Sequence, residues 1–175
     1  MLKDRNDAYE LLQSLGAPAR LIHHAQVVSQ VADLLLKEFK ALGVSCDILT
    51  VELGAVLHDT GKTQHPQELS VSGTHHQQAG KAILLAHGVQ PEVARCCVSH
   101  GVWNPPEVSF EERIVALADK LWKGKRIAEL ELSIMDEIAA RSGVSRWDIF
   151  EKLDTIFEDI AAGGAERIQQ YKNYI

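Results

Sequence analysis

The sequence predicts an all-α protein, and three observations lead to that prediction. Apolar residues recur at spacings of three and four along nearly the whole chain, which is the period of one face of an α-helix. Alternating apolar and polar runs, which would indicate strands, are scarce. Glycine, proline and serine fall where helices of ordinary length would begin or end.

The first half of the chain divides into three expected helices followed by a loop. We expect helices over residues 4–15, 18–42 and 47–58. Gly16 ends the first, Pro18 opens the second, and Gly43 ends it. Residues 60–74 are polar and rich in Gly, Ser, Thr and Pro, so they predict a loop.

The second half predicts further helices. These are expected over residues 75–87, 91–100, 110–124, 132–142 and 145–161. Ser133 and Ser145 are the expected N-caps of the last two. One more helix is expected from Ala165 onward.

Length, charge and cysteine content limit the class of protein. The 175 residues contain no repeat or convincing linker, so we expect one domain over 1–175, with C-terminal helices in 130–175. A net charge of −6 argues against bulk nucleic-acid binding but allows a small metal-lined pocket. We expect neither a signal peptide, because no apolar core follows the charged residues 3–7, nor a membrane span, because no apolar run approaches ~20 residues. Three cysteines without framework spacing indicate reduced thiols in a cytoplasmic protein.

Histidine and aspartate residues recur on apolar helix faces. The adjacent pair His58 and Asp59 closes the apolar segment 53–57, where a helix is expected to stop. Further candidates lie on apolar or small-residue stripes of other expected helices: His24, His76, His100 and Asp119. One such residue is typical of a hydrogen-bonded core position, but burying several is costly unless they share a cation. Imidazole and carboxylate donors suit Mn²⁺, Fe²⁺, Zn²⁺, Co²⁺ or Mg²⁺, and the sequence does not choose among them.

In this order the motifs resemble the HD-domain superfamily of metal-dependent phosphohydrolases, whose signature is H…HD…D on a helical bundle. The likeness covers about residues 18–125. The first motif lies in residues 18–32, and its register favours His24 over His23. Gly61 and Lys62 follow the central His-Asp pair, and Asp119 lies in an Ala-Asp-Lys motif.

The resemblance implies a divalent metal site with one or two ions per chain, and it favours two. Its ligands would be His24, His58, Asp59, His76, His100 and Asp119. Asp59 would bridge the ions, with His76 and His100 on one ion and the other three ligands on its neighbour. His75 is the alternative to His76, and Gly80, four residues after His76, favours the latter.

The resemblance also implies an activity, namely hydrolysis of a nucleotide or other small phosphorylated metabolite by a metal-activated water. Asp59 and Lys62 are the expected catalytic residues. Lys62, Lys120, Lys123 and Trp103 are the expected substrate-binding residues; the alternatives are solvated lysines and a tryptophan that packs its loop onto the bundle. Two other functions stay open: a di-iron oxygenase of the same fold, and a metal-binding sensor without turnover.

Overall fold

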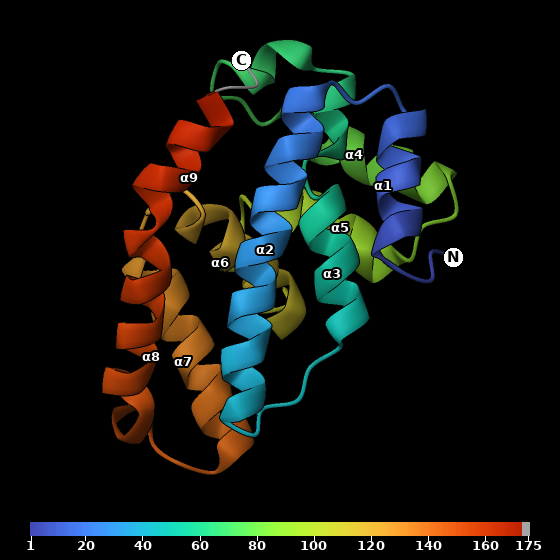
Figure 1. Cartoon of the computed structure of the whole chain (residues 1–175). Helices are drawn as coiled ribbons and strands as arrows, with labels where there is room; N and C mark the ends of the chain where they lie inside the picture. Colours follow the sequence, from blue (N-terminus) through green and yellow to red (C-terminus); the bar gives the residue numbers. More distant parts are fainter. Residues whose placement is uncertain (173–175) are drawn as a thin grey trace.

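A computed structural model describes residues 1–172, which form α-helices and two short 3₁₀ helices without any strand, so the all-α prediction is confirmed (Figure 1). The elements are α1 (Arg5–Ser14), α2 (Ala19–Ala41), α3 (Ile48–Leu57), η1 (Thr60–Thr63), η2 (Pro66–Leu69), α4 (His75–Ala86), α5 (Pro91–Ser99), α6 (Phe110–Leu121), α7 (Ala128–Ser142), α8 (Arg146–Ala162) and α9 (Gly164–Tyr171). None of these helices is long and apolar enough to cross a bilayer. Residues 173–175, the end of the expected C-terminal helices, lie outside the described residues.

Helix α3 lies inside the bundle, where it contacts α1, α2, α5 and α6. Its sequence is apolar nearly all round, as expected of a helix without a solvent-facing side. Gly54 lets α5 and α6 approach α3 closely, because a Cβ at this position would lie 2.7 Å from Cys96 Sγ and 3.0 Å from Val115 Cγ2. The C-terminal end of α3, which carries the His58-Asp59 pair, is thereby held deep in the protein.

Two apolar clusters share α2 and α3. The larger one joins these helices to α6, α7 and α8, through residues such as Phe39, Leu117 and Phe157. The smaller one joins them to α1, α4 and α5, through residues such as Leu12 and Leu84. Figure 1 shows α2 running the length of the molecule between the two groups. The start of α2 therefore lies where helices from both clusters meet.

Side-chain caps fix the starts of α1, α3, α6 and α8, and α7 brings one correction to the sequence prediction. Ser145 caps α8 in a capping box, as expected. Ser133 was expected to cap α7, but it lies inside that helix, and its hydroxyl donates to the carbonyl of Leu130. Helix α7 begins earlier because the buried Glu131 carboxylate accepts the backbone N–H of Ile127. The expected loop 60–74 contains η1 and η2.

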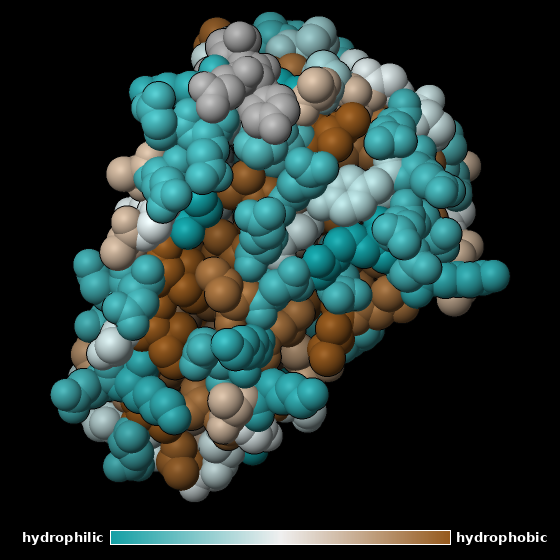
Figure 2. All heavy atoms as spheres, in the orientation of Figure 1, coloured by the Kyte–Doolittle hydropathy of each residue, from teal (hydrophilic) through white to brown (hydrophobic). Residues whose placement is uncertain are grey.

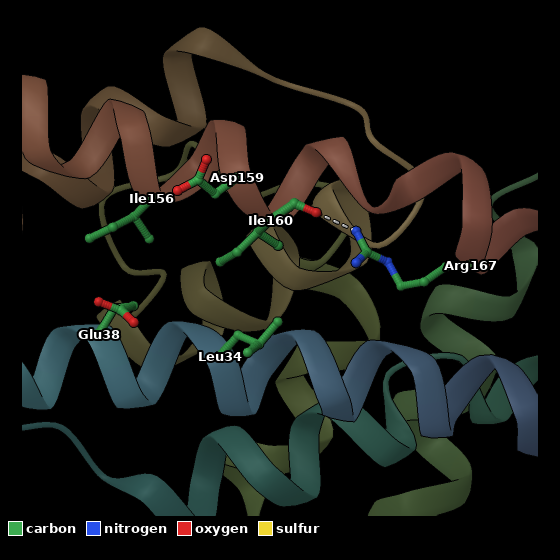
Figure 3. Close-up of a pocket in the computed structure, with 6 residues that line it drawn as sticks. All are labelled: Leu34, Glu38, Ile156, Asp159, Ile160 and Arg167. Atoms are coloured by element: carbon green, nitrogen blue, oxygen red, sulfur yellow. Dashed lines mark hydrogen bonds between the residues drawn. The ribbon is translucent and has the colours of Figure 1, made fainter.

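Arg167 joins the C-terminal helices to α6. Its guanidinium donates to the carbonyls of Leu121 and Trp122 at the end of α6 and to that of Ile160 in α8. Figure 3 shows this side chain at one end of a groove of about 320 Å³ between α2 and α8, with Leu34 on the facing wall. Hydrophobic side chains gather along the same groove in Figure 2. These bonds anchor α9 beside the start of α2.

Gly61 allows η1 to pack directly on α4. A Cβ at this position would collide with the backbone carbonyl of His76 and would lie 2.6 Å from the amide nitrogen of Gly80. Only a residue without a side chain permits this approach. The segment after the His58-Asp59 pair is therefore pressed against the first turns of α4.

Replacing Gly61 by alanine should destabilise the protein, because the added methyl group meets backbone atoms that cannot rotate away. We expect the free energy of unfolding to fall by about 1–3 kcal/mol, measured by urea denaturation followed by circular dichroism. G101A is the matched control, since a Cβ there meets the side-chain amide of Gln77, which can move. Equal stability of G61A and the wild type would contradict the close packing of η1 on α4.

Candidate metal centre

The structure brings together all six residues that the sequence singled out as metal ligands. They come from five helices and form two groups. Within each group the donor atoms all lie within 4.8 Å of one another. The first group is His24, His58 and Asp119, and the second is Asp59, His76 and His100. All six side chains are buried. His58 and His100 each stand at the C-terminal end of a helix, so their rings project past the last turn toward the shared space.

The first group joins α2, α3 and α6. Nε2 of His24 lies 3.2 Å from Nε2 of His58 and 3.5 Å from Oδ1 of Asp119. His58 Nε2 lies 3.6 Å from the same carboxylate oxygen. These donors surround a common point, which is the arrangement that a cation requires.

The second group is linked to the first through Asp59. Its Oδ2 lies 3.2 Å from His24 Nε2, while its Oδ1 lies 3.3 Å from His76 Nε2 and 3.6 Å from His100 Nε2. Oδ1 is buried and has no hydrogen-bond partner among the described residues. One carboxylate thus faces both groups, as a bridging ligand would.

The hydrogen bonds of the imidazole rings show that the second group fits a cation. Nδ1 of His100 donates to the carbonyl of Cys96 at 3.0 Å, and Nδ1 of His76 donates to the Glu68 carboxylate. A neutral imidazole carries one proton, so both Nε2 atoms present lone pairs. These two atoms lie 3.3 Å apart and face Asp59 Oδ1. Three electron-rich atoms with no proton between them are stabilised by a shared positive ion.

The pKa values follow from burial and from the neighbouring charges. Burial, with the nearby His58, lowers the pKa of His100 to about 3, so this ring is neutral at physiological pH. Burial alone would raise the pKa of Asp59, but His58, a hydrogen bond from His24 and the Lys62 ammonium hold it well below its usual range. Asp119 is held low in the same way, with Lys120 beside it. Both aspartates are therefore ionised and available as ligands.

Glu68 separates the roles of the two adjacent histidines. It accepts hydrogen bonds from Nδ1 of both His75 and His76, and from the backbone N–H of each. Burial would raise its pKa, but these bonds lower it to about 2. The His76 ring turns inward to the second group, whereas 79% of the His75 side chain is exposed. The structure therefore places His76, and not its neighbour, among the candidate ligands.

A pocket of about 280 Å³ opens onto both groups. Lys62, Lys120 and Lys123, three of the expected substrate-binding residues, line it. The Lys62 ammonium lies 2.6 Å from Asp59 Oδ2, and that of Lys120 lies 2.7 Å from Asp119 Oδ2. The lining also holds three carboxylates, so its side-chain charges balance before any ion is added.

Trp103, the fourth expected substrate-binding residue, lies outside the pocket lining. It packs against the larger apolar cluster, as expected of the alternative in which this tryptophan packs its loop onto the bundle. Trp122 lines the pocket instead, and its indole N–H is buried without a hydrogen-bond partner among the described residues. Its position three residues after Asp119 on one helix face was the signal available in the sequence.

Tyr171 of α9 closes the side of the site next to His24, which sequence reasoning did not anticipate. Its ring contacts His24 and Trp122 edge-on, and its hydroxyl accepts a hydrogen bond from Nε of Arg20 at 2.9 Å. Arg20 also donates to Ser70 in the segment after η2. Nothing in the local sequence indicates this contact, because it joins residues 151 positions apart.

The adjacent cysteines do not belong to either group of candidate ligands. Both thiols are buried and donate to backbone carbonyls, Cys96 to Glu92 and Cys97 to Leu57. Burial raises the pKa of both thiols, which keeps them protonated. The donor set of this site is therefore imidazole and carboxylate.

A comparison with models of protein families assigns the part of the chain that carries the candidate ligands to one family. The family model for the HD domain matches residues 21–122. This stretch begins just before His24 and ends just after Asp119, so it contains both groups of candidate ligands.

Three archaeal relatives share part of the sequence. A tRNA (cytidine(56)-2'-O)-methyltransferase of Thermoplasma volcanium is 31% identical over 146 residues, which is 75% of this chain and 40% of that protein. The enzyme of the same name from Picrophilus torridus is 28% identical over 152 residues, 78% of this chain and 41% of its own length. An uncharacterized protein of Methanocaldococcus jannaschii is 28% identical over 139 residues, 71% of this chain and 78% of that protein. No solved structure matches the chain.

Removing His76 and His100 together should lower the metal content from two ions per chain to one, because only the second group loses its nitrogen donors. Equilibrium dialysis of the metal-stripped protein with Mn²⁺ measures this stoichiometry. H87A is the control, since the exposed His87 lies in neither group. Two ions retained by the double variant would contradict the assignment of the second group.

Proposed function

The chain belongs to the HD-domain family, and on that premise we propose that it is a metal-dependent phosphohydrolase with a dinuclear site. Its substrate would be a nucleotide or another small phosphorylated metabolite. The observation that carries the proposal is the second group of donors, in which two unprotonated imidazole nitrogens and the unpartnered Oδ1 of Asp59 face one point. The first group stands beside it and shares Asp59.

The charges of the pocket support an anionic substrate. Three carboxylates and three lysines line it, so two divalent ions would leave a local charge of about +4. A phosphate dianion is attracted to such a site even though the whole chain carries −6. The pocket volume of about 280 Å³ suits a small ligand or one end of a larger one.

The protein's own residues would bind and orient the phosphate. The Lys62 and Lys120 ammonium groups lie against the ligand carboxylates and can donate to phosphate oxygens at the same place. Lys123 provides a further donor at the pocket wall, which Trp122 also lines. When bound, divalent ions in such a site activate water and stabilise the oxygens of an in-line displacement.

The names of two relatives describe methyl transfer to tRNA, and we do not extend that activity to this chain. The chain spans about two fifths of the length of each of these proteins. In this chain, candidate metal ligands and lysines line the pocket over both groups, and such residues suit the binding and hydrolysis of a phosphate ester. Because the names of these two relatives refer to tRNA, short RNA fragments that end in a phosphate ester are worth including in a substrate panel.

Asp59→Asn should abolish hydrolysis, because a neutral amide cannot hold two cations together. We expect turnover to fall by about a thousandfold or more, together with a loss of bound metal. The assay uses chromogenic phosphate esters and a nucleotide panel with Mn²⁺, Mg²⁺, Co²⁺ or Fe²⁺, and circular dichroism checks the fold. Normal turnover at full metal content in the variant would exclude the bridging role. Inactivity of the wild type on every substrate with every ion would overturn the hydrolase proposal.

Lys123→Ala should weaken substrate binding while leaving metal content unchanged, since Lys123 lines the pocket without bonding to a candidate ligand. We expect KM to rise about two- to fivefold, and the effect to shrink at high salt, as for other partly exposed charges. Steady-state kinetics at two ionic strengths measures both. Lys125→Ala, outside the pocket lining, is the matched control. An equal change in KM for both variants would show a general charge effect rather than a contact.

A further inference from the structure

Glu68 makes an unusual set of contacts for a residue in a segment expected to be a loop. It belongs to η2, and only 8% of it is exposed. Oε1 accepts the backbone N–H and Nδ1–H of His75, at 3.1 and 2.9 Å. Oε2 accepts the backbone N–H and Nδ1–H of His76, at 3.1 and 2.5 Å. One carboxylate therefore satisfies four donors at the start of α4.

The bond to Nδ1 determines where the His76 ring points. With its proton on Nδ1, the ring directs the Nε2 lone pair to Asp59 Oδ1, 3.3 Å away. His58 and His100 are oriented differently, since their Nδ1 atoms donate to backbone carbonyls within one helical turn. A carboxylate is a stronger acceptor than a carbonyl, and such partners fix the tautomer of a metal-binding histidine and make it a better donor.

We propose that Glu68 is a positioning residue that holds His76 in its metal-binding tautomer and so sets the affinity of the second ion. The proposal rests on the dinuclear function proposed above. It adds a residue outside both groups of candidate ligands and assigns a role to the segment 60–74.

The surrounding backbone is built to admit this carboxylate. Gly73 faces it so closely that a Cβ there would collide with the Glu68 side chain. Thr74, the residue before α4, makes no side-chain cap. Glu68 therefore supplies the acceptors for the first N–H groups of α4, where a negative charge is also favoured by the helix dipole. The start of α4 and the orientation of His76 depend on the same group.

Two substitutions at Glu68 give a graded test. Gln has one acceptor oxygen for the four donors and cannot carry a charge, whereas Leu has similar size and no acceptor. Calorimetric titration of the metal-stripped full chain with Mn²⁺ gives the affinity for each ion separately. We expect the affinity for the second ion to fall about tenfold in E68Q and about a hundredfold in E68L, with the first unchanged.

Two control variants separate positioning from general loss of stability. Glu112 is also a buried carboxylate that caps a helix, accepting the N–H of Ser109, and it contacts neither group. E112Q should lower the free energy of unfolding without changing either affinity. H75Q removes the other imidazole held by Glu68 and should also keep both ions.

The outcomes distinguish this inference from the proposed function. If the wild type binds a single Mn²⁺, the dinuclear proposal fails and the role of Glu68 fails with it. If the wild type binds two and E68L holds the second as tightly, the role of Glu68 alone is overturned. Equal weakening of the second ion in E112Q and E68Q would also overturn it, because the effect would then follow stability. Selective weakening in E68Q and E68L supports it.

Discussion

The burial of Asp59 among imidazole rings is the constraint on which the rest of the site depends. Its two oxygens face different groups, with Oδ2 3.2 Å from His24 Nε2 and Oδ1 3.3 Å from His76 Nε2. A carboxylate this deep in an apolar bundle requires compensating positive charge. Lys62 compensates one oxygen from the pocket side, while Oδ1 faces unprotonated nitrogens. The other candidate ligands are arranged around this unsatisfied oxygen.

That arrangement requires helices to approach more closely than ordinary side chains allow. Gly54 lets α5 and α6 pack on α3, and Gly61 lets η1 pack on α4. The two glycines lie on either side of the His58-Asp59 pair, so the chain is tightly packed immediately before and after these two buried polar residues. Packing and chemistry are thus linked, because the same contacts that fill the core bring five helices to one point.

Local patterns predicted most of the fold and the candidate ligands, whereas contacts between distant segments could not be predicted. The three-to-four spacing and the caps located the helices within a few residues, but α7 starts early because Glu131 reaches back to its first turn. The order of the His and Asp motifs indicated the six residues that the structure brings together. Glu68 and Tyr171 were missed as site residues, because their roles arise only when η2 and α9 fold over the site. Trp103 was predicted to bind substrate, but the tryptophan that lines the pocket is Trp122.

The two groups of donors differ in what holds them in place. The first rests on α2, α3 and α6, helices of the larger apolar cluster, and His58 in it is oriented by its own backbone. The second depends on Glu68, whose element η2 contributes only the partly buried Leu69 to an apolar cluster. Segments with few buried apolar contacts open at lower free energy than the core. An opening of 60–74 would break the hydrogen bond between Glu68 and His76 and leave the first group intact, so the orientation of the second group depends on this segment rather than on the whole bundle.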